Sequence, residues 1–296
     1  MSETSTREDP ASDQHGCVAS LQFYDYPETA SALDGWWMGL ARQYRDLGIP
    51  DVPDHLIRGG LDKDAAARTG RLLFGQTCGY PLIYELKSDV QLVATPHYST
   101  PYTEGPLYRS LIVARASDGH DSLDDLRGAR VAVNGLNSFS GYIALQAAFK
   151  EHVGDEPFFS KVVLTGDHLK SLKAIASNMA DTCACDCVSY ELIQQLYPEL
   201  AAKFSVIGLG PLAPGLPYVT AATHDADIVD RLQTGLFRAL EDPGIADVRK
   251  KLLIADASPL ALKDYQAIVD LVDELKSRDT QSLFPDKQTD KRGTFG

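Results

Sequence analysis

The residues best suited to chemistry lie in one stretch of the chain, between positions 122 and 190. Ser138 and Ser140 stand close together, and His168 and Asp186 follow further along. Hydroxyl and imidazole groups donate hydrogen bonds, whereas a carboxylate accepts them. A helix start adds free backbone N–H groups and a partial positive charge, so serines at such a position favour the binding of a small anion.

Short apolar runs that suit buried strands precede these side chains; they cover residues 130–133, 162–165 and 182–185. Ser138 and Ser140 come after a turn rich in Asn, Gly and Ser, at the predicted start of a helix. His168 lies in the first turn of the next predicted helix, and Asp186 ends the third strand. Because ligands of open α/β sheets bind beyond the carboxyl ends of strands, we expect these four side chains to share one cleft.

The order of these motifs resembles the PhnD-like phosphonate-, phosphate- and phosphite-binding proteins of ABC transporters. The resemblance rests on Asp-Leu-x-Gly before a strand, Ser-x-Ser-Gly after it, and three later motifs at 166–174 (Gly-x-His-x-x-Ser-Leu-x-Ala), 180–186 (Ala-Asp-x-x-Ala-x-Asp) and 214–218 (Pro-Gly-Leu-Pro-Tyr). It implies an α/β, two-lobed periplasmic-binding-protein-like fold of type 2, with a hinge and a ligand cleft between the lobes.

The resemblance also implies a division of the chain. We expect a first lobe from residues 18–112 plus 212–280 and a second lobe from 113–211. Composition predicts a disordered leader at 1–17 and a polar, mobile tail at 281–296. Within the first lobe, strands are expected at 20–23, 71–74 and 90–94, a loop at 95–106, and helices at about 244–254 and 262–276.

Several first-lobe residues become candidates for the ligand site. Tyr24 and Tyr26 follow the first predicted strand, and the alternative is that both are packing aromatics. Gln76 and Thr77 follow the second strand and could donate hydrogen bonds. The resemblance carries over Tyr108 near the crossing to the second lobe. The second lobe adds Asn137, Ser138, Ser140, Gly141, His168 and Asp186.

Two positions leave alternatives open. Arg109 is a permanent cation that could pair with a bound anion or hold Asp residues across the hinge. Phe139 stands where the family commonly has a polar residue, which changes the hydrogen bonding expected there.

The composition of the chain argues against two classes of binding partner. The 296-residue chain has a net charge of −13 and a pI near 4.9, which argues against nucleic acid and anionic membrane. It contains no apolar run of about eighteen residues and therefore no predicted membrane span. The polar N-terminal segment predicts a cytoplasmic protein as written, or a periplasmic one if a native signal has been removed.

The five cysteines do not indicate a metal centre. Cys183, Cys185 and Cys187 alternate, which predicts one face of a strand, and their C-x-C spacing is not the usual zinc spacing. Buried packing is the favoured interpretation, with metal binding and redox sensing as alternatives. Cys78 has no His near it in the sequence and reads as a small turn residue.

No catalytic motif supports an enzyme. The residues around Ser138 and Ser140 lack the glycines of a nucleophile elbow, and no Walker A or dinucleotide-binding motif is present. We therefore expect a monomeric solute-binding protein without cofactor, holding a small phosphorus oxyanion and working with an ABC permease or a regulatory partner. The alternatives are a cytosolic ligand sensor, and an enzyme on the same fold that resembles the thiamine-pyrimidine synthases.

Overall fold

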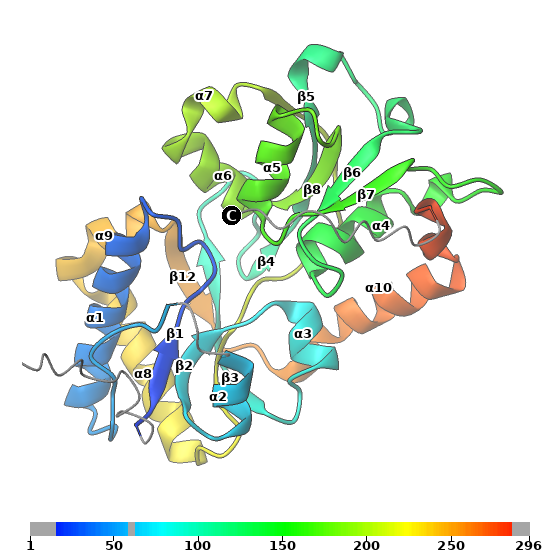
Figure 1. Cartoon of the computed structure of the whole chain (residues 1–296). Coiled ribbons are helices and arrows are strands. Elements are labelled where there is room, and N and C mark those ends of the chain that lie inside the picture. Colours follow the sequence, from blue (N-terminus) through cyan, green and yellow to red (C-terminus); the bar gives the residue numbers. More distant parts are fainter. Residues whose placement is uncertain (1–15, 59–62, 286–296) are drawn as a thin grey trace, which may run out of the picture.

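A computed structural model describes residues 16–58 and 63–285, and the leader predicted at 1–17 lies almost entirely outside these ranges. The described chain forms two α/β lobes, each built on a five-stranded sheet (Figure 1). In the first lobe β1 and β2 are parallel, and the other neighbours are antiparallel. The strands, in sheet order, are β1 (Val18–Ser20), β2 (Leu72–Gln76), β11 (Tyr218–Ala221), β3 (Val90–Tyr98) and β12 (Ile254–Ser258).

The sheet of the second lobe combines both strand directions. Its first three strands run parallel to one another, and the last two pair antiparallel. In sheet order they are β7 (Lys161–Leu164), β6 (Arg130–Val133), β8 (Thr182–Asp186), β5 (Ser110–Arg115) and β9 (Phe204–Leu209).

Helices flank both sheets (Figure 1). Those of the first lobe are α1 (Ala30–Asp46), α2 (Lys63–Arg68), α3 (Gly79–Tyr84), α8 (Ala226–Glu241), α9 (Ala246–Lys251) and α10 (Gln266–Ser277). Those of the second are a single π turn, η3 (Phe139–Ile143), continued by α4 (Ala144–Ala148), then α5 (His168–Ala176), α6 (Cys187–Leu196) and α7 (Pro198–Ala201).

The first lobe is held together by the apolar face of α1. Trp36, Trp37 and Tyr44 recur at helical spacing, and each is almost completely buried. Trp37 stacks on Phe74 of β2 with ring centroids 6.1 Å apart, and Tyr218 of β11 lies on the same ring at 4.9 Å. Large aromatic side chains bury the most apolar area per residue, so this group anchors the sheet that carries the first-lobe side of the site.

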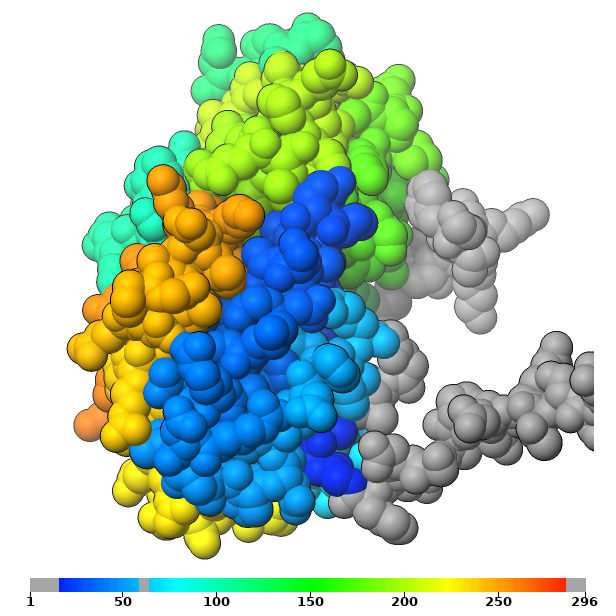
Figure 2. All heavy atoms as spheres, turned by 90° about the vertical axis from the view of Figure 1, so that its left-hand side faces the viewer, coloured from blue at the N-terminus to red at the C-terminus, as the bar shows by residue number. Residues whose placement is uncertain are grey.

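Two connections cross between the lobes side by side. One is the short strand β4 (Leu107–Tyr108), which leads directly into β5, and the other is β10 (Ala213–Pro214), which follows β9. The two short strands pair antiparallel, so the crossings form one small ribbon. Figure 2, which views the molecule from the side of α1 and α9, shows the first lobe (blue, yellow and orange) in contact with the second (green).

A third crossing lies at the C-terminal end of the described chain. Helix α10 begins in the first lobe and runs to the second, where the 3₁₀ turn η7 (Thr280–Leu283) packs beside α4 (Figure 1). Leu283 and Phe284 are buried in the core of the second lobe. The prediction of a mobile tail from residue 281 is therefore wrong for 281–285, because an apolar pair within that polar segment packs on the second sheet.

Three predicted elements need correction. The first strand is Val18–Ser20 rather than 20–23, so residues 21–29 form a loop. Strand β3 continues through Pro96 to Tyr98, although a loop was expected from 95, because β12 pairs with that half. Strand β12 itself was not predicted, and α9 is shorter than the helix expected at 244–254.

Candidate functional site

Three predicted site residues meet at one edge of the second sheet. Strands β6, β7 and β8 are parallel, so the segments that follow them lie at the same edge. The Ser140 hydroxyl lies 2.9 Å from His168 Nε2, and this nitrogen is 3.4 Å from Asp186 Oδ2. Ser140 and Asp186 are only 5% and 3% exposed, so the group lies beneath the surface.

Ser138 opens the helical segment after β6, as its position predicted. Its hydroxyl accepts a hydrogen bond from the backbone N–H of Gly141 at 3.0 Å. Gly141 is required for close approach, since a Cβ there would lie 1.6 Å from Asn134 Oδ1. The Asn134 amide nitrogen lies 3.4 Å from His168 Nε2, so this contact places a further polar side chain in the group.

His168 is the first residue of α5 and is held there by its neighbours. Asp167 caps the helix by accepting from the backbone N–H of Lys170 at 2.7 Å, and the Thr165 and Ser171 hydroxyls lie 2.6 Å apart beneath it. Burial lowers the pKa of His168, and the negative charge of Asp186 opposes this effect only in part. The imidazole is therefore neutral at neutral pH.

Asp186 is the cap of α6. Its Oδ1 accepts from the backbone N–H groups of Val188 at 3.0 Å and Ser189 at 2.9 Å. Asp186 ends β8 and is thus also the residue from which α6 starts, at Cys187. Oδ1 also accepts a hydrogen bond from the Tyr24 hydroxyl of the first lobe at 3.2 Å. The other carboxylate oxygen, Oδ2, faces His168.

Tyr24 reaches across the interface because its loop has an unusual shape. The residue has a φ of 63°, in the left-handed region that a bulky side chain rarely adopts. The Thr29 hydroxyl donates to the Tyr24 carbonyl at 2.6 Å and holds this turn. The Tyr24 ring packs edge-on against Tyr98 at 5.3 Å. Burial, followed by the nearby Asp186 charge, raises the pKa of Tyr24, so its hydroxyl remains a donor.

Two further predicted residues lie at the interface. Tyr108 is 2% exposed, its ring lies 6.1 Å from that of Phe139, and burial raises its pKa while the nearby Ser140 hydroxyl lowers it. Tyr26 is half-buried, and its pKa is raised first by burial and then by the charge of Asp186. These tyrosines therefore pack in the interior and also lie beside the candidate site.

Four other candidates are placed elsewhere or are engaged with neighbours. The Arg109 guanidinium lies 3.5 Å from Glu104 of the preceding loop, so its ion pair is with a Glu rather than with Asp residues. Asn137 donates to Glu85 at 3.2 Å on the exposed rim between the lobes. Gln76 donates to the Tyr98 hydroxyl and to a backbone carbonyl. The Thr77 hydroxyl is buried and has no hydrogen-bond partner among the described residues.

Sequence reasoning missed two neighbours of the site. Asn134 directly follows β6, and its position beyond a strand end was the signal that could have identified it. Cys78 stands at the start of α3 in the first lobe, yet the backbone N–H groups of Tyr80, Phe139 and Ser140 act on its thiol. Burial raises the pKa of the Cys78 thiol more strongly than these N–H groups lower it. No sequence signal indicated that this thiol would lie against the second lobe.

The remaining cysteine prediction is correct only in part. Cys183 and Cys185 point to the same side of β8, but Cys187 already belongs to α6. All three are free thiols and buried, and burial raises the pKa of Cys187 to about 11. Within the described ranges, no group of three or more His, Cys, Asp or Glu side chains could hold a metal ion.

The arrangement can hydrogen-bond a small oxyanion. Ser140, Asn134 and the helix start supply donors, and His168 can donate from either nitrogen once it binds a proton. Asp186 Oδ2 supplies an acceptor among these donors. Among the described residues, no Lys or Arg forms an ion pair with this carboxylate, so recognition would rest on hydrogen bonds. The first lobe contacts this group of side chains through the hydrogen bond from Tyr24 to Asp186.

The chain matches a family model over residues 65–265. The family is described as the periplasmic phosphonate substrate-binding protein of ABC transporters. Because the match covers more than half of the sequence, the chain belongs to this substrate-binding family. No curated protein sequence matches the chain.

Solved structures show the same two-lobed fold. A binding-protein component of an ABC phosphonate transporter from Pseudomonas aeruginosa (PA3383) is 17% identical, with a TM-score of 0.75, covering 91% of this chain and 89% of its own. PhnD1 from Prochlorococcus marinus, in complex with methylphosphonate, is 12% identical with a TM-score of 0.73, covering 88% and 98%. XAC2383 from Xanthomonas citri, bound to chloride, is 15% identical with a TM-score of 0.67, covering 90% and 99%.

These findings place the chain among periplasmic-binding-protein folds and in a family that binds substrates for ABC transporters. No helix within the residues that the structure describes has the length and apolar character needed to cross a membrane.

Proposed function

We propose that this protein binds a small phosphorus oxyanion, a phosphonate, phosphate or phosphite, between its lobes and performs no chemistry on it. The observation that carries the proposal is a series of contacts at the start of a helix: the Ser140 hydroxyl contacts His168, and His168 contacts Asp186. Tyr24 of the first lobe donates a hydrogen bond to the same Asp186 carboxylate. Hydroxyls, an imidazole and backbone N–H groups together match the lone pairs of a tetrahedral oxyanion.

Asp186 supports a ligand that carries a hydrogen-bond donor of its own. A carboxylate accepts hydrogen bonds only, so it would repel a fully ionised oxyanion. A phosphonate, phosphate or phosphite that keeps a proton could donate to Oδ2, and so could a ligand amine. Sulfate has no proton at neutral pH and would be rejected.

A thermal-shift panel tests the proposal. It would contain phosphate, phosphite, methylphosphonate, 2-aminoethylphosphonate, sulfate and a thiamine precursor. A ligand at one hundred times its dissociation constant stabilises the folded state by about 2.7 kcal/mol. We expect one phosphorus oxyanion to raise the melting temperature of the wild-type protein and of the exposed control Ser88→Ala, but not of Ser140→Ala.

The other outcomes separate the alternatives. A flat response to all phosphorus oxyanions would contradict the proposal, and selective binding of the thiamine precursor would favour an enzyme on this fold. We further propose that the liganded form is a monomer and that it engages an ABC permease; the family description supports the second of these two statements. A cytosolic ligand sensor is the alternative, and cell fractionation with co-purification of partners distinguishes the two.

A further inference from the structure

The loop between β1 and α1, residues 21–29, contacts the second lobe along the whole of α6. Three of its side chains, at alternate positions, face residues at the start, in the first turn and just beyond the end of that helix. The pairs are Tyr24 with Asp186, Tyr26 with Ser189, and Glu28 with Tyr197. Asp25, between the first two, instead pairs with Arg58 of the first lobe at 2.6 Å. Alternate side chains of the loop therefore hold the two lobes together.

Thr29 ends this loop at the position directly before α1, where threonine usually caps a helix. Its hydroxyl does not cap α1. It accepts a hydrogen bond from the Tyr26 N–H at 2.9 Å and donates to the Tyr24 carbonyl at 2.6 Å. Thr29 is also 3% exposed, so these bonds are shielded from water. The hydroxyl thus shapes the loop rather than the start of the helix.

The two residues that Thr29 holds are the two tyrosines that face α6. Tyr24 has a φ of 63°, a conformation that a bulky residue keeps only when its surroundings support it. Because the Thr29 hydroxyl fixes its carbonyl, the turn directs the Tyr24 hydroxyl to Asp186. Without the Thr29 hydroxyl, the Tyr24 carbonyl and the Tyr26 N–H lose this partner, and the turn can relax to an ordinary φ. The Tyr24 hydroxyl would then move away from Asp186.

We propose that Thr29 is a positioning residue for the ligand site: from outside the site, it sets the loop so that Tyr24, Tyr26 and Glu28 engage α6 when the lobes close on the oxyanion. The inference rests on the function proposed above. Contacts between the lobes stabilise the closed form, and the apparent affinity for a ligand rises with the population of the form that binds it. Thr29 therefore increases the affinity for the ligand without contacting it.

Isothermal titration with the oxyanion found in the thermal-shift panel tests the proposal. Thr29→Val keeps the shape of the side chain but removes the hydroxyl, and should weaken the affinity about tenfold, the scale of one lost hydrogen bond. Thr29→Ser keeps the hydroxyl and should restore the affinity of the wild type. Thr220→Val is the matched control, because the buried Thr220 hydroxyl of the same lobe donates to the Leu72 carbonyl at 3.1 Å. It should lower the stability and leave the affinity unchanged.

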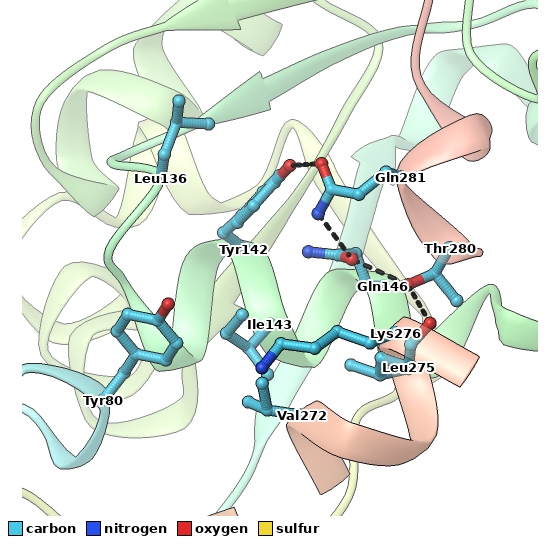
Figure 3. Close-up of a pocket in the computed structure, with 10 residues that line it drawn as sticks. All are labelled: Tyr80, Leu136, Tyr142, Ile143, Gln146, Val272, Leu275, Lys276, Thr280 and Gln281. Atoms are coloured by element: carbon cyan, nitrogen blue, oxygen red, sulfur yellow. Dashed lines mark hydrogen bonds between the residues drawn. The ribbon is translucent and has the colours of Figure 1, made fainter. Parts of the chain in front are cut away.

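A double-mutant cycle shows whether Thr29 acts through Tyr24. Tyr24→Phe removes the hydroxyl that donates to Asp186, so adding Thr29→Val should weaken the affinity by much less than it does in the wild type. The control for loss of a tyrosine hydroxyl is Tyr142→Phe. The Tyr142 hydroxyl points to Gln281, beyond the end of α10, and donates to it at 2.9 Å (Figure 3). In the Tyr142→Phe background, Thr29→Val should keep its full effect.

A further variant keeps the proposal testable if Thr29→Val does not fold. Tyr197→Phe removes the exposed contact with Glu28 at the far end of α6, and should weaken the affinity about threefold. Unchanged affinity in Tyr197→Phe or in Thr29→Val would overturn the proposal, as would a Thr29→Ser protein as weak as Thr29→Val, or full additivity of Thr29→Val with Tyr24→Phe. A wild type that binds no phosphorus oxyanion would contradict the proposed function and this inference with it, whereas the other outcomes contradict the inference alone.

Discussion

At the scale of single residues, the carboxylate of Asp186 serves both lobes. Its Oδ1 caps α6 and receives Tyr24 from the first lobe, while Oδ2 faces His168. One side chain thus joins helix capping, interlobe contact and the candidate ligand site. A substitution at Asp186 would change all three together, so the neighbouring His168 is a better probe of the site alone.

His168 should make the stability of the protein depend on pH. Burial lowers its pKa in the folded state, so the unfolded chain binds a proton first as the pH falls. The stability is complete above the usual histidine range and decreases as the pH falls through about 6.5. Between pH 7 and 5.5 this one group accounts for at most about 1.3 kcal/mol.

Urea unfolding of His168→Asn at several pH values checks this expectation. The variant should lose less stability than the wild type on acidification, whereas the exposed control His55→Asn should behave like the wild type. If His168→Asn and the wild type show the same pH dependence, the imidazole is not neutral in the folded state.

The residues that sequence reasoning misplaced are those whose partners lie far away in the chain. Ser138 was correctly predicted as a helix cap because its partner, Gly141, is three residues away. Asn137 instead donates to Glu85, 52 residues away, which only the folded chain brings near. Local patterns carry no information about such choices.

At the scale of elements, the segment between β6 and α4 is shaped by one close contact. Gly141 allows Asn134 to lie against the helix start, and Asn134 in turn contacts His168. A Cβ at position 141 would displace the Asn134 side chain, which can rotate away but would then leave His168.

We therefore expect Gly141→Ala to weaken oxyanion binding about tenfold while changing the stability by less than about 1 kcal/mol, since loss of one hydrogen bond to the ligand has this magnitude. Isothermal titration with the anion found in the panel measures the effect. Gly154→Ala is the matched control, because nothing lies within 4 Å of the added Cβ there. Wild-type affinity in Gly141→Ala would show that Asn134 does not position the site.

Helix caps provide a second comparison between elements. Asp186 and Asp225 both cap helices, but Asp225 is an exposed cap that accepts from one backbone N–H at 2.9 Å. Asp186→Ala leaves three buried donors without an acceptor and should destabilise the protein by about 3 kcal/mol. Asp225→Ala should destabilise it by about 1 kcal/mol.

Chemical denaturation of the two alanine variants compares these energies directly. Equal destabilisation would mean that burial and the Tyr24 contact add nothing to the capping role of Asp186. Asp186→Asn retains an acceptor and should fall between the wild type and Asp186→Ala.

Elements were predictable where a periodic pattern met a clear boundary. The strands β6 and β8 and the helix α5 have such patterns, and the structure confirms them. Strand β12 has the sequence Ile-Ala-Asp-Ala-Ser, with exposed residues in its middle, and it exists because it pairs with the second half of β3. Tertiary pairing decided both of these segments, so neither could be read from propensity alone.

At the scale of the whole molecule, the C-terminal crossing ties the lobes together. Lys150 pairs with Glu274 of α10 at 2.8 Å, and beyond α10 the ring of Phe284 lies 5.7 Å from that of Phe159 in the second core. Deletion of a large buried aromatic ring removes its transfer energy and leaves a cavity.

Phe284→Ala should therefore destabilise the protein by about 3 kcal/mol, although the residue lies near the end of the described chain. Leu164→Ala, at an exposed position of the same lobe, should change the stability by less than about 0.5 kcal/mol. Thermal unfolding of both variants checks the prediction. A Phe284→Ala protein as stable as Leu164→Ala would mean that this segment does not contribute to the second core.

The order of the strands along the chain also bears on how the protein is made. The first sheet needs β11 and β12, and the second core needs Leu283 and Phe284, so each lobe waits for residues near the end of the sequence. During synthesis from the N-terminus, the ribosome releases both incomplete lobes before either can close its core. The newly made chain thus stays open, and available to chaperones, until Leu283 and Phe284 have left the ribosome.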